Sequence, residues 1–487
     1  MRIAQQGEGE EPYAHRFAAP TAAMDAVAIA LARAFLAAVT QTADSAAGAA
    51  EAMEPSQRAL AAAMQACGRR VLARKWPWLA RLVRHILSET GPQLRPAQHD
   101  EVRALILGFP PFRLAFAADQ PPAVHAWFPW HDAMRSAPRA LAQLALPQID
   151  TPGDLAAWLG LTVGELAWFA DSGGWAARSD TERLRHYRYR WLAKPSGGWR
   201  LLEIPKPRLA ALQRKLLREI LDRVPPHGAA QGAVRGCSAA TNAAAHTGRG
   251  LVLRLDIENF FPTLGAGRIA ALFRTLGYPG AVASLLAALT THGTPAAIAG
   301  AAPLGEYAGA ADLRARRDIA QLYRRAHLPQ GAPSSPALAN LAAYRLDVRL
   351  AGAARACGWI YTRYVDDLFF SGPATTPAQA RRNAQMFLSI LCDEGYTPNC
   401  RKTRIMPRGR RQCVTGLVVN ERPGIARDEF DRFKALLTNC LRHGAASQNR
   451  AGVADFRASV AGRLAWFEQI DSARAAKLRR LFEAIEF

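Results

Sequence analysis

The segment Tyr364-Val365-Asp366-Asp367 places two adjacent aspartates inside the apolar run from Tyr361 to Phe370. Neighbouring side chains on a regular strand point to opposite faces, so both carboxylates can reach one site only if the chain turns tightly between two strands. Two carboxylates at such a turn suit a magnesium ion, which prefers hard oxygen ligands and usually keeps water or substrate phosphates in its shell. An isolated acidic pair is more often a solvated turn, so the surrounding sequence has to decide between the two.

A third aspartate, Asp256, lies near the end of a predicted strand. In residues 251–256, leucines alternate with Val252, Arg254 and Asp256, and this period of two is typical of a strand. We therefore expect three aspartates, from distant parts of the chain, to converge at one site.

The charge balance favours a nucleic-acid partner. The 487-residue chain has 62 lysines and arginines against 40 acidic residues, a net charge of +22, and clustered cations gain affinity for phosphate backbones by releasing counterions. A membrane surface is the competing partner for so basic a chain. We find no uninterrupted apolar run long enough to span a bilayer, and residues 1–17 lack the apolar core of a signal peptide. A cytoplasmic protein without a membrane partner is expected.

Cysteine and histidine spacing predicts neither a zinc site nor a disulfide framework. The seven cysteines are odd in number and never spaced as Cys-x-x-Cys, and the eleven histidines lack the His-Glu-x-x-His pattern. Hydrophobic residues make up 50% of the chain, which is enough for two or three domains with substantial cores.

The chain divides near residue 145 into a helical first part and a mixed second part. Residues 1–20 are polar and are expected to be disordered. Residues 21–145 form a predicted helical extension, in which an apolar stripe through Leu82 and Ile86 lies opposite basic residues such as Arg81. We interpret the extension as a module that binds RNA, an effector or another copy of the chain, with RNA favoured.

Two short helices and a hairpin are predicted beyond this boundary. Thr162 and Glu165 have the spacing of a capping box. The helices around them are either a packed pair, which we favour, or a DNA-reading helix-turn-helix. Two strand-like runs, residues 187–191 and 199–204, flank the segment Lys194-Pro195-Ser196-Gly197-Gly198 and predict a β-hairpin.

These motifs, in this order, resemble those of reverse transcriptases with the right-hand polymerase fold. The resemblance covers roughly residues 150 to 487. It rests on the hairpin from Lys194 to Arg200, Asp256 with Phe260-Phe261, the turn from Leu328 to Pro336, Tyr364-Val365-Asp366-Asp367, and Lys402. It implies an α+β fold of fingers, palm and thumb, preceded by the α-helical N-terminal extension, and the activity of an RNA-directed DNA polymerase.

The same resemblance sets the expected domain limits. The fingers and the start of the palm would occupy residues 146–255, the palm 256–420 and the thumb 421–487, where Phe456 begins an apolar pattern with helical spacing. A glycine- and alanine-rich segment, about residues 290–326, is expected to be a surface insertion in the palm. One helix is expected from Ser335 to Leu350, behind the palm.

The resemblance assigns the aspartates to a site for two magnesium ions. The ligands would be Asp256, Asp366, Asp367 and the backbone carbonyl of Ile257. In such a site one ion activates the primer hydroxyl and the other stabilises the leaving pyrophosphate.

Five further residues are implied to bind the incoming deoxynucleoside triphosphate (dNTP): Lys194, Arg200, Phe261, Gln330 and Lys402. Lys194 and Arg200 would clamp the triphosphate, since a guanidinium suits bidentate contact with phosphate. Gln330 begins a turn rich in glycine and proline that can approach the nucleotide closely. Phe261 would exclude the ribose 2′-hydroxyl, whereas its neighbour Phe260 would serve in the core.

Two short segments narrow the resemblance to the retron reverse transcriptases. Asn242-Ala243-Ala244-Ala245-His246 matches an Asn-Ala-x-x-His signature, and Val414-Thr415-Gly416 matches a Val-Thr-Gly triplet. The resemblance implies that five of these residues take part in binding RNA: Asn242, His246, Val414, Thr415 and Gly416. The first segment would lie on a helix beside the palm, and the triplet would contact RNA near the thumb.

The resemblance also implies the partners. A retron enzyme binds its own structured noncoding RNA, primes synthesis from the 2′-hydroxyl of a specific guanosine, and makes multicopy single-stranded DNA, commonly for antiphage defence. The expected partners are that RNA and its DNA product, dNTPs, an effector or toxin protein, and a host ribonuclease H, since the chain ends at Phe487.

Two other functions stay open from the sequence. An enzyme of the group II intron maturase class would carry a maturase region after the thumb, where this chain stops. A noncatalytic RNA-binding scaffold that restrains a toxin would keep the fold without needing its carboxylates, and the intact Asp256, Asp366 and Asp367 argue against it.

Overall fold

The structure is a computed structural model that describes residues 20–47, 57–91, 94, 98–128, 134, 142–179, 181–194, 198–303 and 310–487. Residues 1–19 of the predicted disordered segment, and residues 195–197 at the tip of the predicted hairpin, lie outside the described residues. The chain forms two compact units. The first comprises Met1–Arg135 with Ile149–Thr151, and the second comprises Ser136–Gln148 with Pro152–Phe487.

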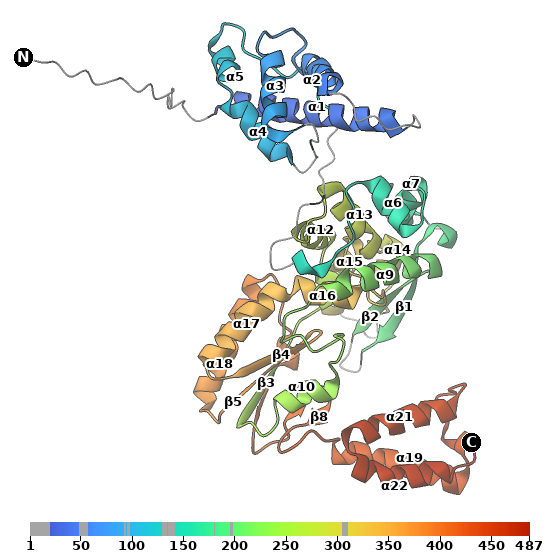
Figure 1. The fold of residues 1–487 in the computed structure, drawn as a ribbon. Helices are drawn as coiled ribbons and strands as arrows, with labels where there is room; N and C mark the ends of the chain where they lie inside the picture. The colour runs from blue at the N-terminus through green and yellow to red at the C-terminus, as the bar shows by residue number, and fades with distance from the viewer. Residues whose placement is uncertain are drawn as a thin grey trace, which may run out of the picture. The chain divides into compact units, whose positions relative to one another are not determined.

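Helices build the first unit (Figure 1). They are α1 (Ala22–Ala47), α2 (Gln57–Leu72), α3 (Leu79–Thr90), α4 (His99–Gly108), α5 (Pro110–Leu114) and the 3-10 helix η2 (Ala115–Ala117). Their apolar sides meet in one core, which includes Phe35, Met64, Leu82 and Phe112. The predicted stripe of α3 is therefore a core face, and the basic residues opposite it face outward.

Helix α1 qualifies the expectation that no uninterrupted apolar run reaches membrane-spanning length. By length and composition, the window Ala22–Val39 is apolar enough to cross a bilayer, and half of that window is buried inside the first unit. Asp25 and Arg33 interrupt the run, which is why a search for an uninterrupted stretch missed it. The core helix of a soluble protein passes the same test, and here Leu31 and Phe35 are buried in the core of the unit.

The second unit begins with short helices and an antiparallel hairpin. The helices are η3 (Ala142–Leu144), α6 (Pro152–Leu159), α7 (Val163–Phe169), α8 (Trp175–Arg178) and η4 (Glu182–Leu184). The predicted capping box of α7 is confirmed, because the backbone N–H of Glu165 donates to Thr162 Oγ1 at 3.2 Å and the Glu165 carboxylate accepts from the Thr162 N–H. The predicted hairpin is confirmed as β1 (Tyr187–Ala193) paired with β2 (Trp199–Pro205).

Further helices of the second unit accompany this hairpin. They are α9 (Pro207–Glu219), η5 (Leu221–Arg223), α12 (Ala266–Thr275), α13 (Gly280–Thr290), α14 (Ala296–Ala299) and α15 (Ala310–Arg324). Ala299 and Tyr323, from the segment expected to be a surface insertion, share a small buried core with Leu201 of β2. The described part of that segment is therefore partly buried against the fingers hairpin.

A four-stranded antiparallel sheet of order β4-β5-β3-β6 forms the palm. Its strands are β3 (Leu251–Asp256), β4 (Ile360–Tyr364), β5 (Asp367–Gly372) and β6 (Arg404–Pro407). Helix α18 (Pro377–Asp393) lies against one face, where Phe370 stacks on Phe387 with 4.1 Å between ring centroids (Figure 1). Helix α10 (Ala239–Ala245) lies on the other face, where the adjoining His246 contacts Thr362 and Ser371.

The helix expected from Ser335 to Leu350 is two helices. These are α16 (Ser335–Ala342) and α17 (Tyr344–Ala356), separated at Ala343, whose backbone angles of φ −87° and ψ 2° leave the helical region. No sequence signal marks this break, because alanine is the best helix former. Helix α17 packs against β4 with its own buried face.

The C-terminal helices form the thumb (Figure 1). They are α19 (Arg427–His443), α20 (Ala445–Gln448), α21 (Phe456–Ile470) and α22 (Ser472–Glu483). The small hairpin of β7 (Cys413–Val414) with β8 (Leu417–Val418) precedes them in the chain. Two short helices, α11 (Phe260–Thr263) and η6 (Cys400–Lys402), lie earlier, after β3 and before β6. The predicted helix from Phe456 is confirmed as α21. Its Phe467 stacks on Phe433 of α19 at 5.0 Å, so apolar packing holds the thumb helices together.

Candidate active site

The palm sheet brings the three predicted aspartates together at one end of its central strands, β3 and β5. Asp366 lies in the two-residue turn between β4 and β5, and Asp367 is paired with Asp256 across the β5–β3 ladder. The turn also binds β3 directly, because the backbone N–H of Ile257 donates to the Asp366 carbonyl at 2.9 Å. Directly opposed residues in an antiparallel pair lie on the same face. The tight turn predicted from the adjacent aspartates is therefore present, with Asp256 beside it.

The turn itself is conformationally costly. Val365 has φ +60°, a left-handed conformation that a β-branched residue rarely adopts and that costs on the order of 1–3 kcal/mol. Gly232 lies so close that a Cβ added there would come within 2.6 Å of the Val365 nitrogen. The close approach of a second backbone segment holds the turn in place, which explains why this position is glycine.

A fully buried arginine, Arg363, hydrogen-bonds the turn and a buried aspartate. The Arg363 guanidinium donates to both carboxylate oxygens of Asp347, at 2.8 and 2.6 Å, to Asn340 Oδ1 at 2.9 Å and to the Val365 carbonyl at 3.1 Å. Tyr361 donates its hydroxyl to the same aspartate at 2.8 Å. Although burial alone would lower the pKa of Arg363, its hydrogen bonds with Asp347 raise the pKa above its usual value. Sequence reasoning missed this network because its partners come from separate elements.

The site combines one buried and two partly exposed carboxylates with nearby cations. Asp256 is 2% exposed, and its Oδ2 accepts from Lys402 Nζ at 2.8 Å. Arg254 donates to both oxygens of Asp367, at 2.8 and 3.0 Å. Burial raises the pKa of Asp366, and the charge of Asp256 adds to the shift. Burial likewise raises the pKa of Asp367, against the opposing effect of Arg254.

The donor set suits a divalent cation. Asp256 Oδ1 is buried without a hydrogen-bond partner among the described residues, and burial raises the pKa values of Asp366 and Asp367 although Arg254 and Lys402 lie nearby. Within the described residues, no group of three or more His, Cys, Asp or Glu side chains could hold a metal ion as placed here. An ion bound by Asp256 and Asp366 would therefore take further ligands from water and nucleotide phosphates, as magnesium commonly does. When bound, such an ion activates a hydroxyl nucleophile and stabilises the leaving phosphates.

The predicted triphosphate clamp faces this carboxylate group. Burial lowers the pKa of Lys194, and Arg200 and Lys402 lower it further, while Glu258 and Asp256 oppose that effect. Arg200 is exposed at the start of β2, and its positive charge acts to lower the pKa of Asp366. Cations from the fingers and the palm thus gather around the aspartates, which is the arrangement needed to bind a polyphosphate beside a metal site.

The turn containing Gln330 is bound to the fingers hairpin. The Gln330 carbonyl accepts from the Glu203 N–H at 2.7 Å. Gly331, at φ +125°, has a backbone conformation that other residues rarely adopt, and a Cβ there would make a tight contact, 3.1 Å, with the Glu203 carbonyl oxygen. The carboxylate of Glu203 is fully buried, with His327 Nε2 2.9 Å away and Thr294 Oγ1 donating to it. This buried group, which the sequence did not reveal, fixes β2 and the Gln330 turn as one unit.

Phe260 and Phe261 differ in exposure. Phe260 is 2% exposed, whereas Phe261 is partly exposed and lies edge-on to it with ring centroids 5.7 Å apart. Both belong to the short helix α11 and not to a strand, so the helix, and not strand alternation, separates their environments. The assignment of Phe261 to sugar selection stays a prediction.

We expect Phe261→Ala to lower the preference for deoxynucleotides over ribonucleotides by at least about tenfold, because it removes a side chain that would occupy the space of a 2′-hydroxyl. Primer extension with single dNTPs and the matching ribonucleotides measures the ratio. Phe261→Tyr keeps the ring and serves as control. An unchanged ratio in Phe261→Ala would remove this residue from sugar selection.

The two short signature segments contact each other. Thr415 donates its hydroxyl to the carbonyl of Ala239 in α10 at 2.7 Å, and Val414 shares a buried core with Ala243. In the turn between β7 and β8, Thr415 and Gly416 both have positive φ, +47° and +85°, which suits the glycine and is unusual for the β-branched threonine. Residues far apart in the sequence thus form one structural feature beside the palm sheet.

The predicted RNA contacts of Asn242, His246 and Val414 need correction. All three residues are 0% exposed. The His246 ring lies 2.7 Å from Ser371 Oγ and 2.7 Å from Thr362 Oγ1, and burial lowers the pKa of His246 to about 4, so a neutral ring packs on the sheet. The side chains of these residues cannot touch RNA in this conformation. His246 joins the end of α10 to the sheet, whereas the amide of Asn242 is buried without a hydrogen-bond partner among the described residues.

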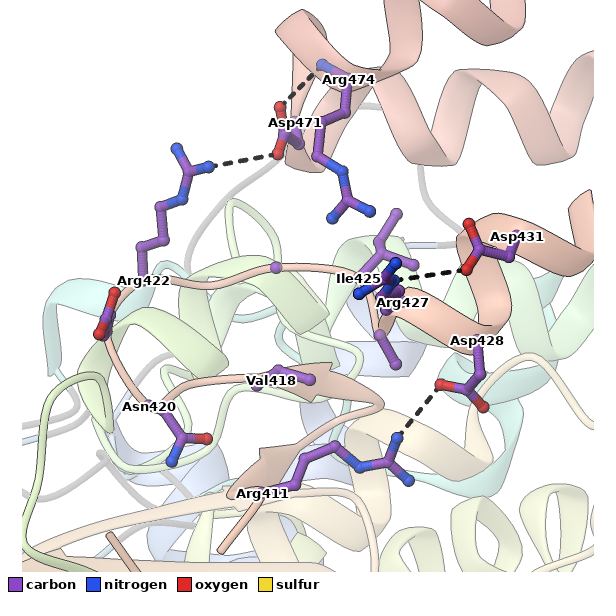
Figure 2. Close-up of a pocket in the computed structure, with 13 residues that line it drawn as sticks. Arg411, Val418, Asn420, Arg422, Ile425, Arg427, Asp428, Asp431, Asp471 and Arg474 are labelled. Atoms are coloured by element: carbon purple, nitrogen blue, oxygen red, sulfur yellow. Dashed lines mark hydrogen bonds and ion pairs between the residues drawn. The ribbon is translucent and has the colours of Figure 1, made fainter. Parts of the chain in front are cut away.

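A pocket of about 670 Å³ lies where β8 leads into the thumb (Figure 2). Ion pairs line it: Arg411 with Asp428 at 3.2 Å, Arg422 with Asp471 at 3.6 Å, and Arg427 with Asp431 at 3.7 Å. Most of these side chains are well exposed, so each pair contributes little to stability. None of the predicted catalytic residues lines the pocket, and we assign the chemistry to the three aspartates of the palm instead.

Comparison with known proteins agrees with this geometry. Residues 192–419 match the family described as "Reverse transcriptase (RNA-dependent DNA polymerase)". The chain is 38% identical to the retron Mx65 reverse transcriptase of Myxococcus xanthus over 347 residues, which cover 70% of this chain and 73% of that protein. It is 33% identical to the retron Ec86 reverse transcriptase of Escherichia coli over 272 residues, 53% of this chain and 74% of that protein.

A second Myxococcus xanthus protein, the retron Mx162 reverse transcriptase, is 35% identical over 283 residues, 56% of this chain and 54% of its own length. The matched family region contains all three aspartates, the Gln330 turn and both signature segments. The predicted right-hand fold with a helical N-terminal extension and the predicted resemblance are confirmed. The chain belongs to the retron reverse transcriptases and is an RNA-directed DNA polymerase.

Proposed function

We propose that this enzyme copies part of its own structured noncoding RNA and begins from an RNA 2′-hydroxyl, so that the product is single-stranded DNA branched from RNA. The observation that supports the proposal is the contact between Thr415 and α10, because it joins the two segments that accompany retron enzymes. It places them together beside the palm sheet, where a specific RNA can be held close to the carboxylates.

We propose magnesium as the ion at the carboxylates, because the donors are hard oxygens and the remaining ligand positions suit water and phosphate. A ribonuclease H from the host would remove the template. An effector or toxin protein, antiphage defence and a cytoplasmic location belong to the same proposal. These elements come from the likeness to retron systems.

The test is to purify the protein from a host that carries its native locus and to treat the bound nucleic acid with ribonuclease or deoxyribonuclease. We expect a discrete small DNA that keeps a covalently attached ribonucleotide after ribonuclease digestion and is absent from cells expressing Asp366→Asn. Heterogeneous RNA without such DNA would contradict the proposal. Protection against phage that survives in Asp366→Asn would favour a scaffold function instead.

A further inference from the structure

Helices α2 and α3 of the first unit, with the segment between them, carry a dense basic surface. Residues 57–90 contain seven basic residues against one acidic residue, Glu89. All seven basic residues are exposed: Arg58, Arg69, Arg70, Arg74, Lys75, Arg81 and Arg84. We call this set the α2–α3 basic surface.

The α2–α3 basic surface is not neutralised within the protein. Among the described residues, none of its members forms an ion pair with a carboxylate, whereas Arg103 on the neighbouring α4 is paired with Asp25 at 2.5 Å. A surface that only maintains solubility usually mixes charges of both signs. Unpaired like charges repel one another, so their concentration here is a cost that a polyanionic partner would offset.

The positions of the charges on α3 do not serve the helix. Arg81 lies in the first turn of α3 and Arg84 in the next, and α3 has no acidic residue in its first turn. Cations near a helix N-terminus interact unfavourably with the helix dipole. Arg69 and Arg70, in the last turn of α2, have the opposite and favourable placement, so they could be explained by the helix alone.

The aromatic residues of this region are engaged inside the protein. The Arg74 guanidinium lies 4.1 Å from the centre of the Trp76 ring and covers it, and Trp78 is 6% exposed and packs edge-on against Phe112. Proteins that hold single strands present free aromatic rings for base stacking. Duplex RNA is instead recognised through phosphates, 2′-hydroxyls and shape. The surface therefore fits a duplex and not an unpaired strand.

We propose that the α2–α3 basic surface is a second RNA-binding site, which holds a base-paired region of RNA outside the polymerase unit. It acts through phosphate contacts without reading sequence. The proposal goes beyond copying and priming, and it holds whichever hydroxyl primes synthesis.

The test uses the full chain and the triple variant Lys75→Gln, Arg81→Gln, Arg84→Gln, whose three side chains form no hydrogen bond or ring contact within the described residues. The matched control is Arg355→Gln, Arg381→Gln, Arg382→Gln, which removes the same charge from exposed positions on α17 and α18. Fluorescence anisotropy measures binding of a labelled RNA duplex of about 20 base pairs at several salt concentrations. Extension of a short primer–template reports separately on the palm.

We expect the triple variant to bind the duplex at least about tenfold more weakly at 0.15 M salt, with a salt dependence less steep by about two to three in the log–log slope. Its extension of the short primer–template should equal that of the control. Binding equal to the control would overturn the proposal, and so would an equal loss of binding and extension. Wild-type binding to phosphatidylserine vesicles that is lost in the triple variant while duplex binding is unchanged would assign the surface to a membrane instead.

Discussion

We expect Asp366→Asn to reduce deoxynucleotide incorporation by at least about 100-fold, the typical effect of removing one preorganised electrostatic group from an active site. Asp366 lies at the turn beside the buried Asp256, one of whose carboxylate oxygens has no hydrogen-bond partner among the described residues. The amide keeps the size of the side chain but removes the charge that would balance a divalent cation. Single-turnover primer extension with excess enzyme measures the effect on the chemical step.

The control for this experiment is Asp393→Asn, which changes an exposed carboxylate paired with Arg349 on the outer side of the palm. Its extension rate should equal that of the wild type. RNA binding should be unchanged in both variants, since the substitution acts on the reaction and not on the recognition of RNA. An Asp366→Asn enzyme that extends primers within about threefold of the wild-type rate would exclude this residue from the catalytic site.

The positions of the three aspartates were predictable because each has a strong local signal. Alternating leucines mark β3, and adjacent aspartates inside an apolar run require a tight turn. The strand follows from a period of two and the turn from the adjacent aspartates, whereas the fold was implied by the resemblance to reverse transcriptases. These local signals do not specify the register between strands. Asp256 is paired with Asp367 only because β3 and β5 pair in one particular register.

The supports of the site could not be predicted from the sequence. Gly232 resembles any other glycine until the Val365 backbone is seen beside it. Glu203 looks like an exposed strand residue, yet it is buried with His327 and Thr294. Arg254 offered one usable signal, since it precedes Asp256 by two residues and lies on the same face of its strand. Long-range contacts of this kind come only from tertiary structure.

The resemblance to retron reverse transcriptases identified the family correctly, but it assigned RNA contacts to residues whose side chains are buried. Asn242 and His246 mark the family as a short signature, and a signature does not say whether its side chains are exposed. Both are buried, and His246 contacts the palm sheet through Thr362. A short signature in an RNA-binding enzyme can thus lie inside the protein, out of direct contact with RNA.

The second large effect is expected in stability. Asp347→Asn should lower the free energy of unfolding by about 3–5 kcal/mol, the usual cost of leaving one member of a buried ion pair without its partner. Arg363 and Asp347 both have fully buried side chains, and Arg363 is held in its charged form by this aspartate. An asparagine offers one acceptor oxygen where two are used, and its amide would direct N–H donors at a guanidinium that only donates. Urea denaturation measures the change.

Asp428→Asn is the matched control, since it breaks an ion pair with Arg411 in which both side chains are more than half exposed, and we expect a loss below about 1 kcal/mol. A similar small loss in Asp347→Asn would contradict a structural role for the buried pair. Because Arg363 also donates to the Val365 carbonyl, the same substitution releases a turn whose backbone is already strained. Primer extension by the folded fraction should therefore fall as well, although Asp347 touches neither nucleotide nor metal. Stability and catalysis are linked here through a single guanidinium beneath the turn.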